Sequence, residues 1–225
     1  MVNVIAINGS PKAEKGNTDK LLNPFLDGMA EAGASIDKYY VRHLIVKPCT
    51  GELTCWNEKP GICHIQDDMQ LIYPKLRQAN ILVLATPVYI PLPVEMQNFI
   101  NRLVPIMEPN LSYKEGRTRA RLRSNVNINK IVLVSTSGWW ETSNLGTVLR
   151  IVQEFAADAS VEFAGALLRS HFGEIAKHQD KAKQIYEAAK KAGSELIVKG
   201  SIDKLLLDVI SQPLITEEEW IERLK

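Results

Sequence analysis

The sequence predicts an α/β fold with a doubly wound, five-stranded parallel sheet, helices on both faces and a short helical tail at the C-terminus. Two observations carry this prediction. Short apolar runs alternate with amphipathic segments along the chain, and several runs are apolar at successive positions, as in strands buried on both faces. Parallel strands joined by helices need right-handed crossovers, which place helices over both faces of the sheet.

The expected strands are the five apolar runs, at residues 4–7, 36–44, 81–85, 131–135 and 161–168. Between them, apolar residues recur with helical spacing. We expect helices from Thr18 to about Gly33, over 69–76 behind the capping residues Asp67 and Asp68, over 94–107, over 145–155 and over 185–196. Residues 109–130 read as a long connection.

The chain divides into a main domain, residues 1–200, and a tail, residues 201–225. The tail contains two short helical patterns, 202–210 and 216–224, and Thr216 with Glu219 has the spacing of a capping box. A segment of this length cannot bury a core of its own. We therefore expect it to pack on the domain or on a neighbouring subunit.

Composition indicates an ordinary globular protein. Of the 225 residues, 45% are hydrophobic and 24% charged, and the net charge of +1 favours neither a nucleic-acid nor a membrane partner. No apolar run approaches the roughly 18 residues that span a bilayer, and the first residues lack a signal-peptide pattern. We expect a cytoplasmic protein. Its three cysteines, an odd number, argue against a disulfide framework.

The turn after the first expected strand, residues 8–19, is long and crowded with hydrogen-bond donors. The N-terminus of a helix offers unpaired N–H groups and a favourable dipole to a phosphate, and the two glycines of the turn let the backbone approach it closely. The alternative is a plain strand-to-helix turn with a polar cap. The candidate phosphate-binding residues are Ser10, Lys12, Asn17 and Thr18.

Three segments together resemble a known family. N-G-S-P-K-x3-G-N-T at residues 8–18 resembles the flavin-phosphate loop of the NAD(P)H-dependent FMN reductases and iron–sulfur flavoproteins of the flavodoxin-like superfamily. T-P-V-Y at 86–89 and S-T-S-G-W at 135–139 follow the third and fourth strands, where this family places its other flavin loops. The resemblance covers about residues 1–200 and implies a flavodoxin-like FMN-binding domain with NAD(P)H as electron donor.

An isoalloxazine ring needs an apolar wall and a few hydrogen bonds to its polar edge. The candidate ring-binding residues are Pro87, Val88, Tyr89, Thr136, Ser137 and Gly138. Tyr89 would equally suit the edge of a core. Trp139 or Trp140 could cover the ring or form a subunit contact. Because hydride passes directly from nicotinamide to flavin, we expect no catalytic acid or base.

The three cysteines, Cys49, Cys55 and Cys63, lie in a stretch that resembles the cluster motif of iron–sulfur flavoproteins. That motif has four cysteines, and here Glu52 stands at the second position. A carboxylate is a poor ligand for a [4Fe–4S] cluster, which usually takes four thiolates. We therefore expect no metal and buried cysteines near the flavin or a subunit contact. An iron–sulfur cluster, or zinc completed by His64 or Glu52, remains the alternative.

Two further groups of residues allow more than one interpretation. Arg117, Arg119, Arg121 and Arg123 alternate along the long connection. They would suit the 2′-phosphate of NADPH or an acidic partner, but a solvated loop is the simpler interpretation. The four histidines are scattered. His171 follows the fifth strand, where it could border the site, but a surface position is the simpler expectation.

The leading function is an FMN-dependent oxidoreductase that passes electrons from NAD(P)H to a small acceptor: a quinone, a flavin, a nitro compound or a metal ion. One alternative is a flavoprotein electron carrier of the iron–sulfur flavoprotein type that serves a protein partner. Another is a flavodoxin-like binding protein without flavin. The small tail, the cysteine stretch and the tryptophan pair favour a homodimer or homotetramer.

Overall fold

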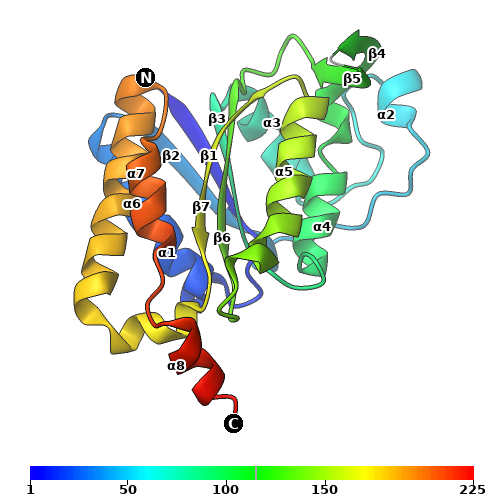
Figure 1. Cartoon of the computed structure of the whole chain (residues 1–225). Coiled ribbons are helices and arrows are strands. Elements are labelled where there is room, and N and C mark those ends of the chain that lie inside the picture. The colour runs from blue at the N-terminus through cyan, green and yellow to red at the C-terminus, as the bar shows by residue number, and fades with distance from the viewer. Residues whose placement is uncertain (115) are drawn as a thin grey trace.

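The computed structural model describes residues 1–114 and 116–225 and contains the five-stranded parallel sheet that the sequence predicts (Figure 1). The strand order is β2-β1-β3-β6-β7, which is the flavodoxin-like doubly wound order. The strands are β1 (Asn3–Asn8), β2 (Ser35–Tyr40), β3 (Ile81–Pro87), β6 (Lys130–Thr136) and β7 (Glu162–Arg169). The predicted fold class is confirmed.

Helices cover both faces of the sheet (Figure 1). The face built from Val4 and Ala6 packs against one set of helices, and the face built from Ile5 and Ile7 packs against the other. This alternation follows from the two-residue period of a strand, and both faces are apolar because both are covered. The first set is α1 (Asn17–Glu31), α6 (Gln179–Lys199) and α7 (Lys204–Ser211); the second is α3 (Met69–Gln78), α4 (Val94–Asn101) and α5 (Gly146–Asp158).

Helices α1 and α6 touch through their backbones. A Cβ atom added to Gly28 of α1 would lie 1.8 Å from the carbonyl oxygen of Lys190. One added to Gly193 of α6 would lie 2.0 Å from the carbonyl oxygen of Phe25. No side chain fits at either crossing point, so the two glycines set the distance between the helices.

The segment after α4 differs from the prediction. The expected helix over 94–107 ends at Asn101, because a 3-10 helix (η3, Val104–Ile106) follows and Met107 begins a strand. The expected loop is a separate antiparallel hairpin, β4 (Met107–Lys114) and β5 (Arg117–Leu122), which lies at upper right in Figure 1. Its ion pairs are Arg117–Glu154 at 2.7 Å, Arg119–Asp158 at 2.6 Å and Arg121–Glu108 at 2.6 Å.

The segment between β2 and α3 holds the cysteines. The predicted second strand stops at Tyr40 and continues as a 3-10 turn (η2, Val41–His43), followed by the short helix α2 (Thr54–Asn57). Of the two predicted capping residues of α3, Asp67 bonds the start of the helix through its side chain, whereas Asp68 does not. Asp67 accepts the N–H of Met69 at 3.0 Å, but its main partner is the Arg102 guanidinium.

The tail packs on its own chain. Helix α7 contacts α6 and β7, and α8 (Glu217–Glu222) follows after a short connection. The predicted capping box of Thr216 and Glu219 is present at the start of α8. Short 3-10 helices complete the chain: η1 (Ala13–Lys15), η4 (Thr142–Leu145) and η5 (Phe172–Lys177). No helix within residues 1–114 and 116–225 is long and apolar enough to cross a membrane.

Candidate functional site

A cavity of about 320 Å³ lies beyond the carboxyl ends of β1, β3 and β6, at the lower end of the sheet in Figure 1. All ten candidate site residues line it, together with two that the sequence did not single out, Pro11 and Lys15. In open α/β sheets this edge is where ligands bind. The ten residues are Ser10, Lys12, Asn17, Thr18, Pro87, Val88, Tyr89, Thr136, Ser137 and Gly138.

The phosphate-loop end of this cavity is rich in free donors. Helix α1 begins at Asn17 after Gly16, and within the described chain no side chain caps its N-terminus. The first-turn N–H groups of a helix have no partner inside the helix, so they remain available to an anion. A Cβ on Gly16 would lie 2.5 Å from the Ser10 hydroxyl, so the loop is as tight as a glycine allows. Lys12 and Lys15 add positive charge.

A buried polar network fixes the shape of this loop. The Asn8 side-chain oxygen accepts the N–H of Ser10 at 2.9 Å, and its amide donates to Asp19 at 3.0 Å. Lys38 donates to the same Asp19 oxygen at 3.1 Å. Asp19 is buried and paired with Lys38, so its negative charge is balanced. The network therefore leaves the phosphate loop both rigid and electropositive.

Hydrogen bonds also join the three loops to one another. The hydroxyls of Thr18 and Thr136 lie 2.8 Å apart. The N–H of Val88 donates to the Thr136 carbonyl at 2.9 Å, and the Ser135 hydroxyl donates to the Thr86 carbonyl at 2.8 Å. The loops after β1, β3 and β6 therefore form one connected wall.

A second, more apolar cavity of about 310 Å³ adjoins the first. The two share Val88, Tyr89, Ser137 and Gly138, and the second is completed by Ile90, Trp139 and Asn144. Three of its aromatic and aliphatic side chains are open to solvent: Tyr89 is 56% exposed, Ile90 100% and Trp139 69%. The polar cavity suits a phosphate and its sugar chain, whereas the apolar one suits a flat ring. The residues present therefore fit FMN.

Trp139 and Trp140 point to different places. Trp139 lines the apolar cavity. Trp140 instead stacks on His171, with ring centroids 6.5 Å apart, and its indole N–H donates to the Ile215 carbonyl at 3.1 Å. His171 is only 1% exposed, so the expected surface position was wrong. The sequence could not show this, because the segment that buries His171 lies more than forty positions further along the chain.

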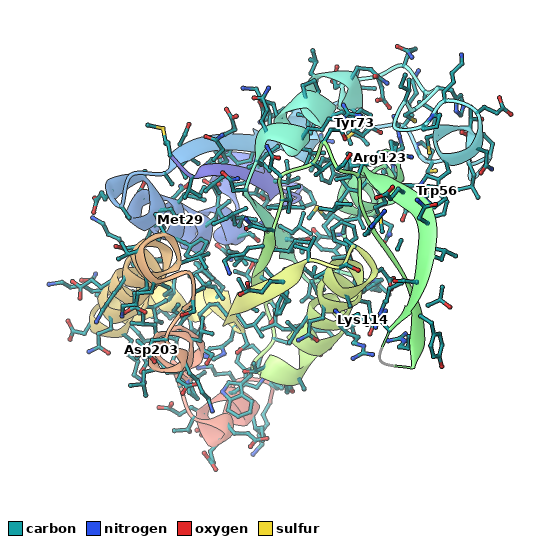
Figure 2. The ribbon with its side chains drawn as sticks, turned by 90° about the horizontal axis from the view of Figure 1, so that it is seen from above. Met29, Trp56, Tyr73, Lys114, Arg123 and Asp203 are labelled. Atoms are coloured by element: carbon teal, nitrogen blue, oxygen red, sulfur yellow. The ribbon has the colours of Figure 1, made fainter. Side chains whose placement is uncertain are left out.

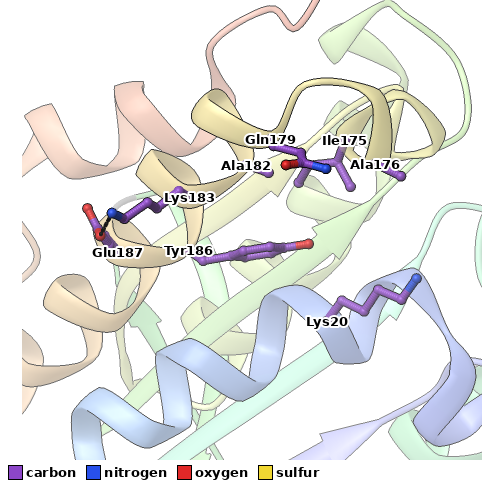
Figure 3. Close-up of a pocket in the computed structure, with 8 residues that line it drawn as sticks. All are labelled: Lys20, Ile175, Ala176, Gln179, Ala182, Lys183, Tyr186 and Glu187. Carbon is purple, nitrogen blue, oxygen red and sulfur yellow. Dashed lines mark ion pairs between the residues drawn. The ribbon is translucent and has the colours of Figure 1, made fainter.

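A larger hollow of about 480 Å³ lies elsewhere, between α1 and the start of α6 (Figure 3). It shares no residue with the two cavities, and the charged groups Lys183 and Glu187 on its rim pair with each other at 3.9 Å. Its lining does not include the phosphate-loop residues whose N–H and side-chain donors face the first cavity.

Helix α2, which carries Cys55, and the β4–β5 hairpin with its arginines lie at upper right in Figure 1, away from these cavities at the lower end of the sheet. The Arg123 guanidinium donates to the carbonyls of Pro105 and Cys55, beside the hairpin. Figure 2 labels Arg123 and Trp56 on this side of the molecule. Within one chain, the arginines therefore lie away from a ligand bound at the lower end of the sheet. Of the two places expected for the cysteines, beside the flavin or at a subunit contact, Cys55 does not occupy the first, and the second stays a prediction.

Only two of the three cysteines are buried: Cys55 and Cys63 are, and Cys49 is exposed. Burial, with a smaller contribution from its acidic neighbours, raises the pKa of the Cys55 thiol to about 11. Glu52 accepts a hydrogen bond from Thr50 and lies 2.7 Å from the His64 ring. In the part of the chain that the structure describes, no three His, Cys, Asp or Glu side chains are arranged to hold a metal ion.

Comparisons with known proteins show which family the sequence resembles. The sequence model of the NADPH-dependent FMN reductase family matches residues 2–140. An iron–sulfur flavoprotein of Archaeoglobus fulgidus is 31% identical over 114 residues, 50% of this chain and 50% of that protein. One of Methanosarcina thermophila is 30% identical over 112 residues, 49% of this chain and 57% of that protein. The chain thus spans about half the length of the curated relatives that it matches.

Solved structures share the fold. An FMN-dependent NADH-azoreductase from Bacillus anthracis, in complex with FMN, aligns with a TM-score of 0.60 at 15% identity, over 88% of this chain and 100% of that one. Identity this low concerns the fold alone. The family model, by contrast, covers more than half of this sequence, including all ten candidate residues. The chain belongs to the NADPH-dependent FMN reductase family.

Proposed function

We propose that residues 1–200 bind FMN across the two adjoining cavities and that the protein passes electrons from NAD(P)H through this flavin to a small acceptor. The acceptor classes are a quinone, a free flavin, a nitro compound or a metal ion. One observation carries the proposal: the ten candidate flavin-binding residues, which come from three separate loops, line a single cavity.

The chain's own contribution is binding and orientation. Ser10, Asn17, Thr18 and the first-turn N–H groups of α1 hold the phosphate, and Lys12 balances its charge. The loops at 87–89 and 136–138 hold the ring. Bound FMN would supply the redox chemistry, accepting a hydride and releasing electrons to the acceptor. The protein places two rings in contact and needs no acid or base for that task.

Asn17 and Thr18 give the direct test. Replacing both by alanine is expected to weaken FMN binding by about 1–3 kcal/mol, because side-chain hydrogen bonds to a charged phosphate are lost. Quenching of flavin fluorescence during titration measures the affinity. Thr118→Ala, on the exposed face of β5, is the matched control and should leave the affinity unchanged. Equal affinity of wild type and double variant would remove the phosphate assignment, and no binding by the wild type would favour the flavin-less alternative.

A flavoprotein electron carrier is the second candidate, and the names of the curated relatives, iron–sulfur flavoproteins, favour it. The two functions differ in a simple assay. Steady consumption of NAD(P)H with a small acceptor supports the enzyme. A yellow protein that oxidises NAD(P)H negligibly supports the carrier.

We further propose that the protein carries no [4Fe–4S] cluster and that Glu52 is the reason. The Glu52 carboxylate is engaged by Thr50 and His64, and the stretch offers three thiolates where a cluster usually takes four. Wild type purified without oxygen is expected to show flavin absorption only and negligible iron. Glu52→Cys, which restores the four-cysteine spacing, is the variant able to gain a cluster. About four irons and four acid-labile sulfides per wild-type chain would contradict this proposal.

Self-association as a homodimer or homotetramer is also proposed. Its support is the set of exposed apolar side chains that line the apolar cavity, Tyr89, Ile90 and Trp139. Apolar surface of this kind is typical of sites that contact another molecule. Light scattering decides the matter, because a species of 25.2 kDa would be a monomer.

A further inference from the structure

An arginine without a carboxylate lies beside the candidate site. Arg169, at the end of β7, is completely buried, and in the described chain no acidic side chain forms an ion pair with it. Its guanidinium donates instead to three carbonyls: Ile210 at 2.9 Å, Gln212 at 2.6 Å and Ser170 at 3.0 Å. Burial lowers the pKa of Arg169 to about 10. A buried charge of this kind needs a compensating arrangement.

The C-terminus of α7 supplies that arrangement. The last carbonyls of a helix have no partner inside the helix and carry the negative end of its dipole. Ile210 lies in the last turn of α7, and Gln212 follows its end. Arg169 therefore joins the end of the main sheet to the end of α7. Without the Arg169 side chain, the carbonyls of Ile210 and Gln212 would lose this donor, and without the end of α7 the buried guanidinium would lose two acceptors.

His171 and Trp140 bind the next part of the tail. The N–H of Leu214 donates to Nε2 of His171 at 3.0 Å, and Nδ1 of the same ring lies 3.0 Å from the Ser170 hydroxyl. Trp140 donates to the Ile215 carbonyl at 3.1 Å. Burial, and then the charge of Arg169, lower the pKa of His171 to about 4, so the ring is neutral and able to accept the tail N–H at neutral pH.

The same short segment holds the loop that lines both cavities. The N–H of Ser137 donates to the Arg169 carbonyl at 3.0 Å, and the N–H of Phe172 donates to the Ser137 carbonyl at 3.1 Å. The N–H of His171 donates to the Trp139 carbonyl at 2.6 Å. His171 adopts a left-handed backbone with φ of 35°, which a side-chain-bearing residue adopts only when its surroundings impose it. Residues 169–172 thus have the tail on one side and the flavin loop on the other.

We propose that tail residues 210–215 position the flavin loop at 137–139 through Arg169, His171 and Trp140. The tail would then be part of the flavin site without lining either cavity. This inference rests on the proposed FMN-binding function. His171 is a positioning residue, since its N–H bonds the carbonyl of Trp139, while its neighbours Arg169 and Phe172 bond the backbone of Ser137.

Two substitutions at His171 separate positioning from packing. His171→Phe keeps a ring of similar size but removes both nitrogens, whereas His171→Gln keeps a neutral acceptor for the Leu214 N–H. Hydrogen exchange of the ligand-free protein reports on the hydrogen bonds between residues 169–172 and the loop at 137–139. A fluorescence titration with FMN reports on the flavin site. We expect His171→Phe to speed exchange of the Ser137 and Phe172 amides by about tenfold or more and to weaken FMN binding by about tenfold, from lost hydrogen bonds. His171→Gln should restore most of both.

Trp56→Phe is the matched control, because it removes an indole donor, here to the Val104 carbonyl at 3.0 Å, at the opposite end of the molecule. Trp140→Phe is the milder variant to use if His171→Phe fails to fold, with the same expected directions. Faster exchange at the loop with unchanged FMN affinity would overturn the positioning role, and so would unchanged exchange. No FMN binding by wild type would instead refute the proposed function. The exchange data would still decide whether the tail holds the loop at 137–139 in place.

Discussion

Replacing Asp67 by alanine is expected to lower the free energy of unfolding by about 3–5 kcal/mol, the cost of leaving a buried charge without its partner. The side chains of Asp67 and Arg102 are both fully buried, and their closest atoms lie 2.6 Å apart. Asp67 also accepts the N–H groups of Lys47 at 2.9 Å and Met69 at 3.0 Å. The Arg102 guanidinium and these two backbone bonds hold the pKa of the Asp67 carboxyl below its usual range, despite the opposing effect of burial.

Urea unfolding of the variant measures the loss, and Asp68→Ala is the matched control. Asp68 is the next residue, and its carboxylate accepts one backbone N–H, from Ile45 at 2.7 Å, without a buried cation. We expect the control to cost about 1 kcal/mol. Because Arg102 also donates to the Lys47 carbonyl at 2.8 Å, the Asp67 variant should release the cysteine segment and speed the reaction of Cys63 with a thiol reagent. Similar losses for both variants would contradict the assigned role of the ion pair.

Gly193→Ala is expected to destabilise the protein by about 2–3 kcal/mol, even though alanine favours a helix by about 1 kcal/mol over glycine. The added methyl group would lie 2.0 Å from the Phe25 carbonyl oxygen, so α1 and α6 must move apart. A change of this size lowers the melting temperature by about 5–10 °C in a chain of this length. Since α1 begins at the phosphate loop, FMN affinity should fall as well.

Gly146→Ala is the control for this prediction. Gly146 also starts from a helical backbone, at the beginning of α5, but a Cβ there meets nothing within 4 Å. Alanine at that position should be neutral or stabilise by up to about 1 kcal/mol. A melting temperature for Gly193→Ala at or above that of wild type would mean that the helices do not touch at this point.

The elements that local pattern determines were predictable. Continuous apolar runs identified the central strands around Ile5 and Val83, because a strand covered on both faces has no polar positions. The loops were predictable too, since the carboxyl ends of parallel strands meet at one edge and Ser10, Val88 and Ser137 each follow such an end. Position in the sheet, rather than any single residue, brought the candidate site together.

What the sequence left open depends on partners far along the chain. Asp67 reads as a helix cap until Arg102, thirty-five positions away, is placed against it. Arg117 and Arg119 read as a solvated loop because their acidic partners belong to a helix that the sequence does not place beside them. His171 reads as a surface residue because nothing local predicts that the tail covers it. In each case the local pattern did not reveal the partner that lies far along the chain.

The wall that the two cavities share has a consequence for how this protein can diversify. Under the proposed function FMN occupies both cavities, so a substitution at Val88, Tyr89, Ser137 or Gly138 alters the binding of the ring and of the phosphate chain together, because each residue lines both cavities. Ile90, Trp139 and Asn144 line only the outer one. These three positions are therefore where the surface around the ring, which an incoming acceptor meets, can change without disturbing the phosphate end of the cofactor site.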